Sequence, residues 1–470
     1  MTHHFEPWEP GVRLADKWTD IFREDPAVHV SIMLSVAAAC FQGFLKDHIG
    51  GPLPYALADG FFLLAFMWWF ATRALSREPL LVTPRGSMQT TLLLITLLPA
   101  LYLAVPGTPL LIQLAGLRAW SLFPLACIMA LSVIRNSAQA RAHVAVVLGL
   151  CLVTAIYGII QYRLGPGSPL AGGAFSTERH GSTVFYFVQG QASQFRAFST
   201  FTFPAPFAGM MVFGMILAAG GALNQFRPFK HRIALAMLIP ILFIAMTLSG
   251  TRAALIELVL GLMVVAFLRG FSVMQVLLAI PLTLALHFAV VLTSGHAVSR
   301  FGSIFTQEGA LWTYVAQPMV VAWRIMGQHP FGVGLGRTGV GVPFLITSHM
   351  PVGYFIFSDG DIGRAAVDMG ALGLLVLAFV IFGLLPLTLK AARMLVGHEE
   401  EGVGVGAGAL VLSGGVIILI GSPLSAAPHG IIWWFFLGVV IKLALLRSRA
   451  DAEEPTEEAA QDEEPVAGSG

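Results

Sequence analysis

Charged residues are scarce in this chain. Asp, Glu, Lys and Arg make up 11% of its 470 residues, whereas a soluble domain typically carries about 25%. The net charge is only +1, so no surplus of positive charge indicates a nucleic-acid partner. Hydrophobic residues make up 56% and the mean hydropathy is +0.78. The composition therefore excludes an ordinary soluble domain and predicts an integral membrane protein that does not bind nucleic acid.

Cysteine is also scarce, and its distribution excludes two kinds of site. Cys40, Cys127 and Cys151 lie inside apolar runs, with spacings that fit neither a metal site nor a disulfide framework. We interpret them as small buried hydrophobic residues. The sequence shows no cluster of metal ligands and no nucleotide-binding loop, so it predicts no metal and no other cofactor. Residues 1–26 lack the apolar core and cleavage site of a signal peptide, and we expect them to form a cytoplasmic segment.

Long apolar runs fill most of the remaining sequence. A membrane helix needs about 20 mostly apolar residues, and by this length the chain is predicted to be all-α and polytopic, with about twelve transmembrane helices. Lys and Arg are most frequent in the connections on one side, such as 227–232, which places both termini in the cytoplasm. The predicted transmembrane domain covers 27–446. Its spans are centred in 27–45, 55–72, 89–105, 111–134, 143–162, 203–223, 232–249, 253–268, 273–294, 367–389, 403–424 and 430–446.

Two connections on the outer side are long, at 163–202 and 295–366. Long loops in a compact protein are usually functional or disordered, and we expect these two to cover an outward-facing cavity. The second contains residues 300–330, which are predicted to form a partly amphipathic helix at the membrane interface, followed by a Gly-rich turn. The acidic tail at 447–470 has no aromatic residue and is predicted to be disordered in the cytoplasm.

Arginines gather beside the outer ends of the predicted spans. Arg196 directly precedes the sixth span, Arg252 begins the eighth, and Arg337 and Arg364 lie in the second long loop. A charge beside a membrane span is costly and is a functional candidate for that reason. The guanidinium group suits phosphate oxygens, so arginines that converge at the outer rim would bind a diphosphate. Alternatively, each arginine extends to lipid headgroups or pairs with a nearby acid.

Five short motifs occur in a characteristic order, and they are TAIYGIIQYRLG (154–165), RAFSTFTFPAPFA (196–208), SGTRAALIELVLG (249–261), RIMGQHPFGVGLG (324–336) and VDMGALGLL (367–375). Together they resemble elements of the O-antigen ligase and O-antigen polymerase superfamily, and the order and spacing agree over most of the chain. The resemblance implies a metal-independent membrane glycosyltransferase with a GT-C-like fold, which acts at the periplasmic face of the bacterial inner membrane. It also implies that Arg196 and Arg252 bind the diphosphate of an undecaprenyl-linked donor.

The resemblance also suggests a proton acceptor. Where ligases of the superfamily carry a catalytic histidine, this chain has Asp359, and an aspartate there resembles the acid–base element of related peptidoglycan polymerases. A carboxylate can take the proton of an attacking hydroxyl. His349 is the nearest upstream histidine and is the second candidate. Asp359 could instead cap a helix start, and Asp361, Arg364 and Asp368 could pair along one helix face.

The expected function is polymerisation of undecaprenyl-diphosphate-linked oligosaccharide units into a surface or secreted polysaccharide. One lipid-linked chain would be the donor and the glycan of another lipid-linked unit the acceptor, with membrane lipid and chain-length or export proteins as further partners. A single displacement with one base would invert the donor carbon. Two alternatives stay open. One is a ligase that transfers glycan to lipid A–core, and the other is a transporter of lipid-linked glycan, which the lack of repeated halves disfavours.

Four further residues in the apolar segments receive a structural interpretation. Asp59 and Glu257 are rare acids near or within predicted spans. A buried acid there is expected to pair with an arginine, and neither acid is assigned a functional role. Trp433 and Trp434 fit an aromatic belt at the membrane interface.

Overall fold

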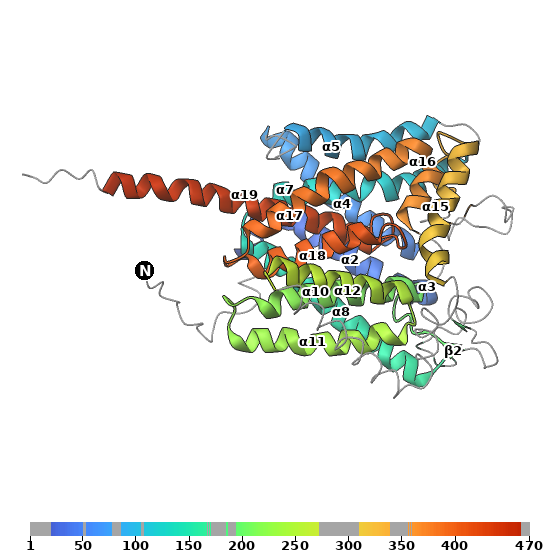
Figure 1. Ribbon diagram of the computed structural model, residues 1–470, viewed down its shortest axis with the longest axis horizontal. Coiled ribbons are helices and arrows are strands. Elements are labelled where there is room, and N and C mark those ends of the chain that lie inside the picture. Colours follow the sequence, from blue (N-terminus) through green and yellow to red (C-terminus); the bar gives the residue numbers. More distant parts are fainter. Residues whose placement is uncertain are drawn as a thin grey trace, which may run out of the picture.

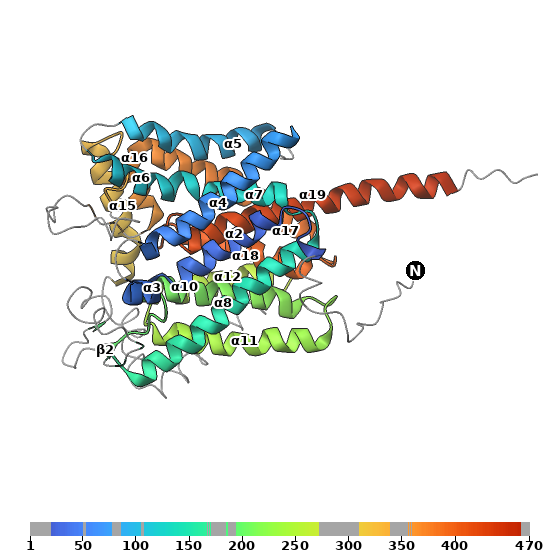
Figure 2. The same cartoon turned by 180° about the vertical axis from the view of Figure 1, so that it is seen from behind.

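Long helices lie side by side and roughly parallel to one another in both ribbon views (Figures 1 and 2). The computed structural model describes residues 20–49, 53–77, 86–104, 108–166, 168, 170, 185–186, 194–271, 310–338, 356, 358 and 360–461. The only strands in this part of the chain are β1 (Phe185–Tyr186) and β2 (Gln194–Phe195), which pair antiparallel. The prediction of an all-α membrane protein is confirmed.

The helices follow the apolar segments of the sequence. They occupy every predicted span except 273–294, which lies outside the described residues. In chain order they are α2 (Pro26–Cys40), α3 (Gln42–Ile49), α4 (Leu53–Ser76), α5 (Gly86–Leu97), the 3-10 helix η1 (Leu98–Ala104), α6 (Leu110–Leu117), the π-helix η2 (Arg118–Leu122), α7 (Pro124–Val133), α8 (Ser137–Leu164), α10 (Pro204–Leu223), α11 (Phe229–Leu248), α12 (Arg252–Leu268), α15 (Ala310–Gln328), α16 (Asp361–Ala378), the π-helix η5 (Phe379–Leu384), α17 (Leu385–Met394), α18 (Glu401–Ile417) and α19 (His429–Gln461).

Six helical segments among the described residues are long and apolar enough to cross a membrane. A seventh is obtained if α2 and α3, which meet at a bend of 69°, are one broken span. The protein is therefore membrane-embedded, while the count of twelve spans stays a prediction. The six segments are Leu110–Val133, Ser137–Leu164, Pro204–Leu223, Phe229–Leu248, Asp361–Met394 and His429–Ala452.

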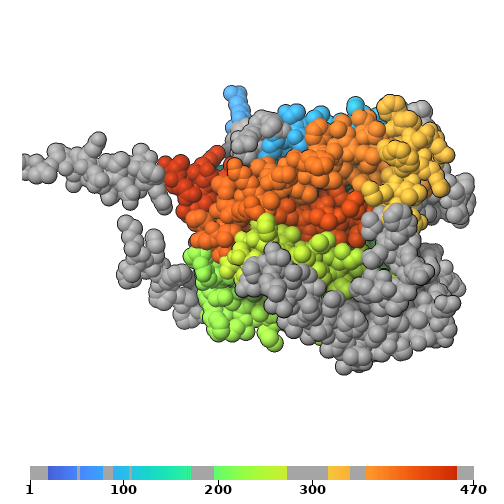
Figure 3. Space-filling view, in the orientation of Figure 1, coloured from blue at the N-terminus to red at the C-terminus, as the bar shows by residue number. Residues whose placement is uncertain are grey.

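Helix α15 differs from its neighbours in direction. It runs across one end of the bundle rather than along it (Figures 1 and 2). It packs against α16, and the two form one continuous surface in the space-filling view (Figure 3). The predicted helix at 300–330 is thus confirmed as a helix over Ala310–Gln328.

Helix α16 is broken in its middle by Gly370. This residue has φ 59° and ψ −136°, a region that only glycine adopts readily. The backbone groups freed by the break find other partners: the Val333 N–H donates to Val367 O at 2.8 Å, and the Tyr102 hydroxyl donates to Met369 O at 2.6 Å. The Gly-rich turn 331–338 therefore packs into the break, which brings the last two sequence motifs into contact.

Helix α18 forms the centre of the bundle and is almost completely buried. Small residues let its backbone approach its neighbours closely. A Cβ atom added to Gly220 of α10 would lie 2.5 Å from the Gly406 Cα of α18. The many glycine and alanine residues of α18 are thus explained by close helix packing.

We expect Gly220→Ala to destabilise the protein by about 1–3 kcal/mol, because the added methyl group overpacks the contact between α10 and α18. Gly149→Ala in α8 is the matched control, since a Cβ there meets nothing within 4 Å. That change should be neutral or stabilise by about 0.5–1 kcal/mol, because alanine is the better helix former. Unfolding of the purified protein in detergent checks both, and equal effects of the two changes would contradict the packing interpretation.

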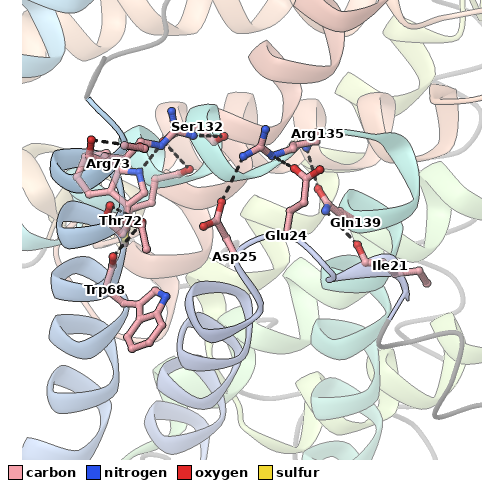
Figure 4. A network of polar contacts seen from close by, with 12 residues as sticks. Ile21, Glu24, Asp25, Trp68, Thr72, Arg73, Ser132, Arg135 and Gln139 are labelled. Carbon is pink, nitrogen blue, oxygen red and sulfur yellow. Dashed lines mark hydrogen bonds and ion pairs between the residues drawn. The ribbon is translucent and has the colours of Figure 1, made fainter. Parts of the chain in front are cut away.

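Polar contacts tie several helices together at the end of the bundle opposite α15 (Figure 4). Arg135 pairs with Glu24 and lies 3.6 Å from Asp25. The Arg73 guanidinium donates to Ser132 O at 3.1 Å. These contacts join α4 and the α7–α8 connection to the segment before α2. Two further ion pairs, Arg269–Glu401 and Arg141–Glu399, connect helix ends nearby.

Two predictions about the C-terminal region are wrong. Helix α19 continues to Gln461 and projects from the bundle (Figure 1), so 447–461 are helical where a disordered tail was predicted. Ala, Glu and Gln are good helix formers and extend the preceding helix. Trp433 and Trp434 are buried inside the bundle rather than in an aromatic belt, and the Trp433 indole donates to Val411 O at 3.0 Å. Residues 462–470 lie outside the described part.

Candidate functional site

A cavity of about 200 Å³ opens between α10, α12, α16 and the connection from α18 to α19. Its charged and polar lining comes from Thr251, Glu257, Arg364, Ser422 and His429. Phe203, Pro206, Phe213 and Pro423 contribute to its apolar wall. The cavity thus combines residues from five helices, α10, α12, α16, α18 and α19.

Four helix N-termini converge on this cavity. Helices α10, α12, α16 and α19 begin at Pro204, Arg252, Asp361 and His429, and each contributes residues to the wall from its first turns or the residue before them. The N-terminus of a helix carries a partial positive charge of roughly half an elementary charge and presents free backbone N–H groups. The dipoles of the four helices therefore favour a negative group at this place.

Arg196 is held beside the cavity by the turn between α11 and α12. Its Nε donates to Ser249 O at 2.8 Å, and its Nη2 donates to the Thr251 hydroxyl at 3.1 Å. The Ser249 hydroxyl also lies 3.2 Å from Thr251 Oγ1. Arg252 is the next residue and begins α12, where it is partly buried. The structure therefore brings Arg196 and Arg252, predicted from two separate motifs, to the same turn.

Gln161 of α8 shapes the segment that carries Arg196. Its Oε1 accepts hydrogen bonds from the N–H groups of Phe198 at 3.0 Å and Ser199 at 2.8 Å. Its Nε2 donates to Ser199 O at 3.2 Å, and Ser199 has a positive φ of 55°. A single buried amide thus fixes a strained turn directly after Arg196. The first two sequence motifs meet here, since Gln161 belongs to one and Ser199 to the other.

Arg364 lines the cavity from α16 and is anchored at its base. Its Nε donates to Ser358 O at 3.2 Å and its Nη1 donates to the Ser425 hydroxyl at 3.3 Å. Asp361, which is fully buried, accepts from the Ser425 hydroxyl at 2.5 Å and from Leu424 N–H at 2.9 Å. Asp361 therefore fastens the 418–428 connection to the start of α16 and holds the position of Arg364.

Asp368 has a different structural role from the helix-face pairing that its spacing suggested. Its carboxylate accepts from the Trp120 indole N–H at 3.0 Å and from Thr338 N–H at 3.3 Å. Asp361 and Asp368 thus bind partners on other elements, at opposite ends of the first half of α16. Arg337 lies in the Gly-rich turn beside this region and is not among the residues that line the cavity.

Both predicted proton acceptors, Asp359 and His349, lie outside the described residues. Their roles stay predictions. Ser358 and Gly360, the described neighbours of Asp359, lie at the start of α16, and Gly360 lines the cavity.

Two further residues of the cavity received no functional role from the sequence. Glu257 and His429 are both more than nine-tenths buried and line the cavity wall. The expected arginine partner exists for Asp59, which pairs with Arg118 at 3.0 Å. For Glu257 the described residues show no such ion pair. The only signal in the sequence was the rarity of an acid inside an apolar segment, which marks Glu257 and not His429.

Metal ligands do not gather in the described part of the chain, where no group of three or more His, Cys, Asp and Glu residues could hold an ion. The three cysteines are free and buried, as predicted. No protein-family model matches the chain, and no curated protein matches it significantly.

Proposed function

We propose that the protein is a membrane glycosyltransferase that polymerises undecaprenyl-diphosphate-linked oligosaccharide units into a polysaccharide. The observation that carries the proposal is the cavity at which four helix N-termini meet, with Arg364 in its wall and Arg196 and Arg252 at its edge. Such a site suits a strongly anionic group. The diphosphate of a polyprenyl-linked glycan is an anion that reaches a membrane protein from the lipid phase.

The chemistry follows from the position of these positive groups. Transfer of a glycan from a diphosphate leaves a new negative charge on the departing oxygen. Arginine guanidinium groups and helix N-termini that are already in place stabilise this charge as it develops. The Arg196 and Arg364 side chains are fixed by backbone and hydroxyl partners, which limits the reorganisation needed during the reaction. Arg337 is proposed as a more distant contact to the same substrate.

The remaining parts of the proposal rest on the sequence. Asp359 takes the proton of the attacking sugar hydroxyl, with His349 as the second candidate, and inversion of the donor carbon follows from a single displacement. The chain crosses the bacterial inner membrane about twelve times and has both termini in the cytoplasm. The loops at 163–202 and 295–366 and the cavity then face the periplasm, and the glycan of a second lipid-linked unit is the acceptor.

A ligase is the second candidate function. It would use the same anion site for its donor and would differ only in its acceptor, lipid A–core. The cavity favours both enzymes equally, since both have to hold a diphosphate. Transport of the lipid-linked glycan is less well supported, because the arginines lie at helix ends rather than in the middle of the spans.

The proposal is tested by deleting the gene and complementing the deletion with variants at matched membrane expression, with the polysaccharide examined on a gel. We expect the wild-type chain to restore long chains and Arg252→Ala to leave mostly single repeat units. Asp359→Asn should act like Arg252→Ala, whereas His349→Ala should retain long chains. If His349→Ala stops transfer to core while Asp359→Asn is normal, the ligase function replaces the polymerase. Unchanged polysaccharide in the deletion strain itself would contradict both enzymes.

A further inference from the structure

The carboxyl group of Glu257 is buried at the wall of the cavity, and one of its oxygens lacks a hydrogen-bond partner among the described residues. Its side chain is 7% exposed, and within the described residues Oε1 has no hydrogen-bond partner. Glu257 lies six residues after Thr251 on α12, which places it about 9 Å further along the helix axis. Burial of a polar group without a partner destabilises a fold. A contribution to stability therefore does not explain why a glutamate occupies position 257.

His429, which also lines the cavity, carries a second unsatisfied polar atom. The residue is 8% exposed, and its Nε2 has no hydrogen-bond partner among the described residues. The ring is fixed in place by α10: it stands edge to face on Phe213 with 5.0 Å between ring centroids. A Cβ on Gly209 would lie 2.4 Å from Nε2, so only glycine leaves room for the imidazole here.

The charges of the cavity divide it into two regions. Arg364, with Arg196 and the helix N-termini beside it, attracts an anion, whereas Glu257 has no cation paired with it among the described residues and brings no positive charge to its side of the cavity. A diphosphate is therefore favoured near the arginines rather than near Glu257. The group that fits beside Glu257 is neutral and donates hydrogen bonds. Mg²⁺ or Ca²⁺ is a poorer fit, because either ion needs six or more oxygen ligands.

We infer that Glu257 and His429 form a hydroxyl-binding subsite of this cavity, which holds a sugar ring of the substrate next to the diphosphate. The inference rests on the proposed function. The Glu257 carboxyl group accepts a hydrogen bond from one sugar hydroxyl, and His429 supplies the second polar contact to the sugar. The volume of about 200 Å³ lies below the roughly 300–1,000 Å³ of sites for drug-sized ligands, so the cavity is too small to hold an oligosaccharide beside the diphosphate. Phe203 and Phe213 supply apolar wall for the ring.

The test compares Glu257→Met, Glu257→Gln and His429→Phe with the wild type in three measurements. These are long-chain polysaccharide in the complemented deletion strain, binding of undecaprenyl diphosphate to the purified protein by native mass spectrometry, and thermal unfolding in detergent. Glu399→Met is the matched control, since Glu399 is 64% exposed and pairs with Arg141 at the opposite end of the bundle.

We expect Glu257→Met to reduce long chains at least 10-fold, because methionine offers no strong acceptor, and His429→Phe to reduce them as well. Glu257→Gln keeps one carbonyl oxygen and should retain more chain formation than Glu257→Met. All three variants should bind undecaprenyl diphosphate within about twofold of the wild type, because the probe has no sugar. Thermal stability of Glu257→Met should be unchanged or higher, since an unsatisfied buried carboxylate is removed.

Two results would overturn the inference while the proposed function stands. One is wild-type amounts of long chains in Glu257→Met. The other is a fall in thermal stability of Glu257→Met that matches its loss of polysaccharide, which would make the residue structural. If the wild-type protein itself does not bind undecaprenyl diphosphate, the proposed function fails as well, and that outcome is distinct from both.

Discussion

Replacement of Arg364 by alanine is expected to reduce long-chain polysaccharide by at least about 100-fold, the loss typical when one preorganised donor to a developing negative charge is removed. Arg364 is the arginine that lies directly in the cavity wall, and its guanidinium is oriented by Ser358 O and the Ser425 hydroxyl. Alanine removes both the positive charge and these hydrogen bonds. The measurement is the polysaccharide gel of the complemented deletion strain, together with binding of undecaprenyl diphosphate.

Two further variants test whether the loss is specific to the guanidinium group of Arg364. Arg364→Lys keeps the charge without the planar fork of donors, so it should recover part of the binding and little of the polymerisation. Arg324→Ala removes an exposed arginine of α15, a helix that does not contribute to the cavity wall, and should leave both measurements unchanged. Normal long chains in Arg364→Ala would show that this cavity is not the donor site.

Asp361→Ala is expected to cause the largest loss of stability among single changes near the cavity. Asp361 is fully buried and accepts hydrogen bonds from the Ser425 hydroxyl and from Leu424 N–H. Removal of the carboxylate leaves two buried donors without their partner, at about 1–3 kcal/mol for each. The 418–428 connection, which forms one wall of the cavity, then loses its attachment to α16.

This second prediction is checked by thermal unfolding and by the fraction of monodisperse protein in detergent. Asp451→Ala is the control, because Asp451 is 49% exposed and pairs with Arg447 on the surface of α19, where an ion pair contributes little. Asp361→Asn should be intermediate, since it keeps one acceptor oxygen. If Asp361→Ala unfolds at the wild-type temperature, Asp361 does not hold the connection in place.

The helices could be predicted from the sequence because a membrane helix is defined by a local property, a run of about 20 apolar residues. The places where these helices are interrupted could not be predicted from the sequence. The π-helices η2 and η5 and the break at Gly370 depend on partners elsewhere in the fold, such as the Tyr102 hydroxyl that satisfies Met369 O. Length alone also could not separate complete spans from shorter buried helices such as α18.

The site was predictable to the extent that its residues stand out chemically. Arginines at the ends of apolar runs are conspicuous, and Arg196 and Arg364 do lie at or beside the cavity. The hydrogen-bond partners of the charged residues were less predictable. Asp368 lies one helical turn after Arg364 on the same helix face, yet its partner is Trp120, 248 residues earlier in the chain. His429 gave no signal, since an imidazole becomes a candidate only when the fold buries it beside a cavity.

The break at Gly370 makes the first half of α16 a short independent arm. Residues 361–369 span about 13 Å at 1.5 Å per residue, and the arm is fixed at each end by a segment that is not helical. Leu424 and Ser425 hold its beginning, and the turn at 331–338 holds its end. The position and direction of the Arg364 side chain are therefore set by two loops rather than by a continuous helix. Insertions or deletions in these loops would therefore move the guanidinium relative to the cavity. The substrate preference of the protein can change in this way without replacement of any residue that contacts the substrate.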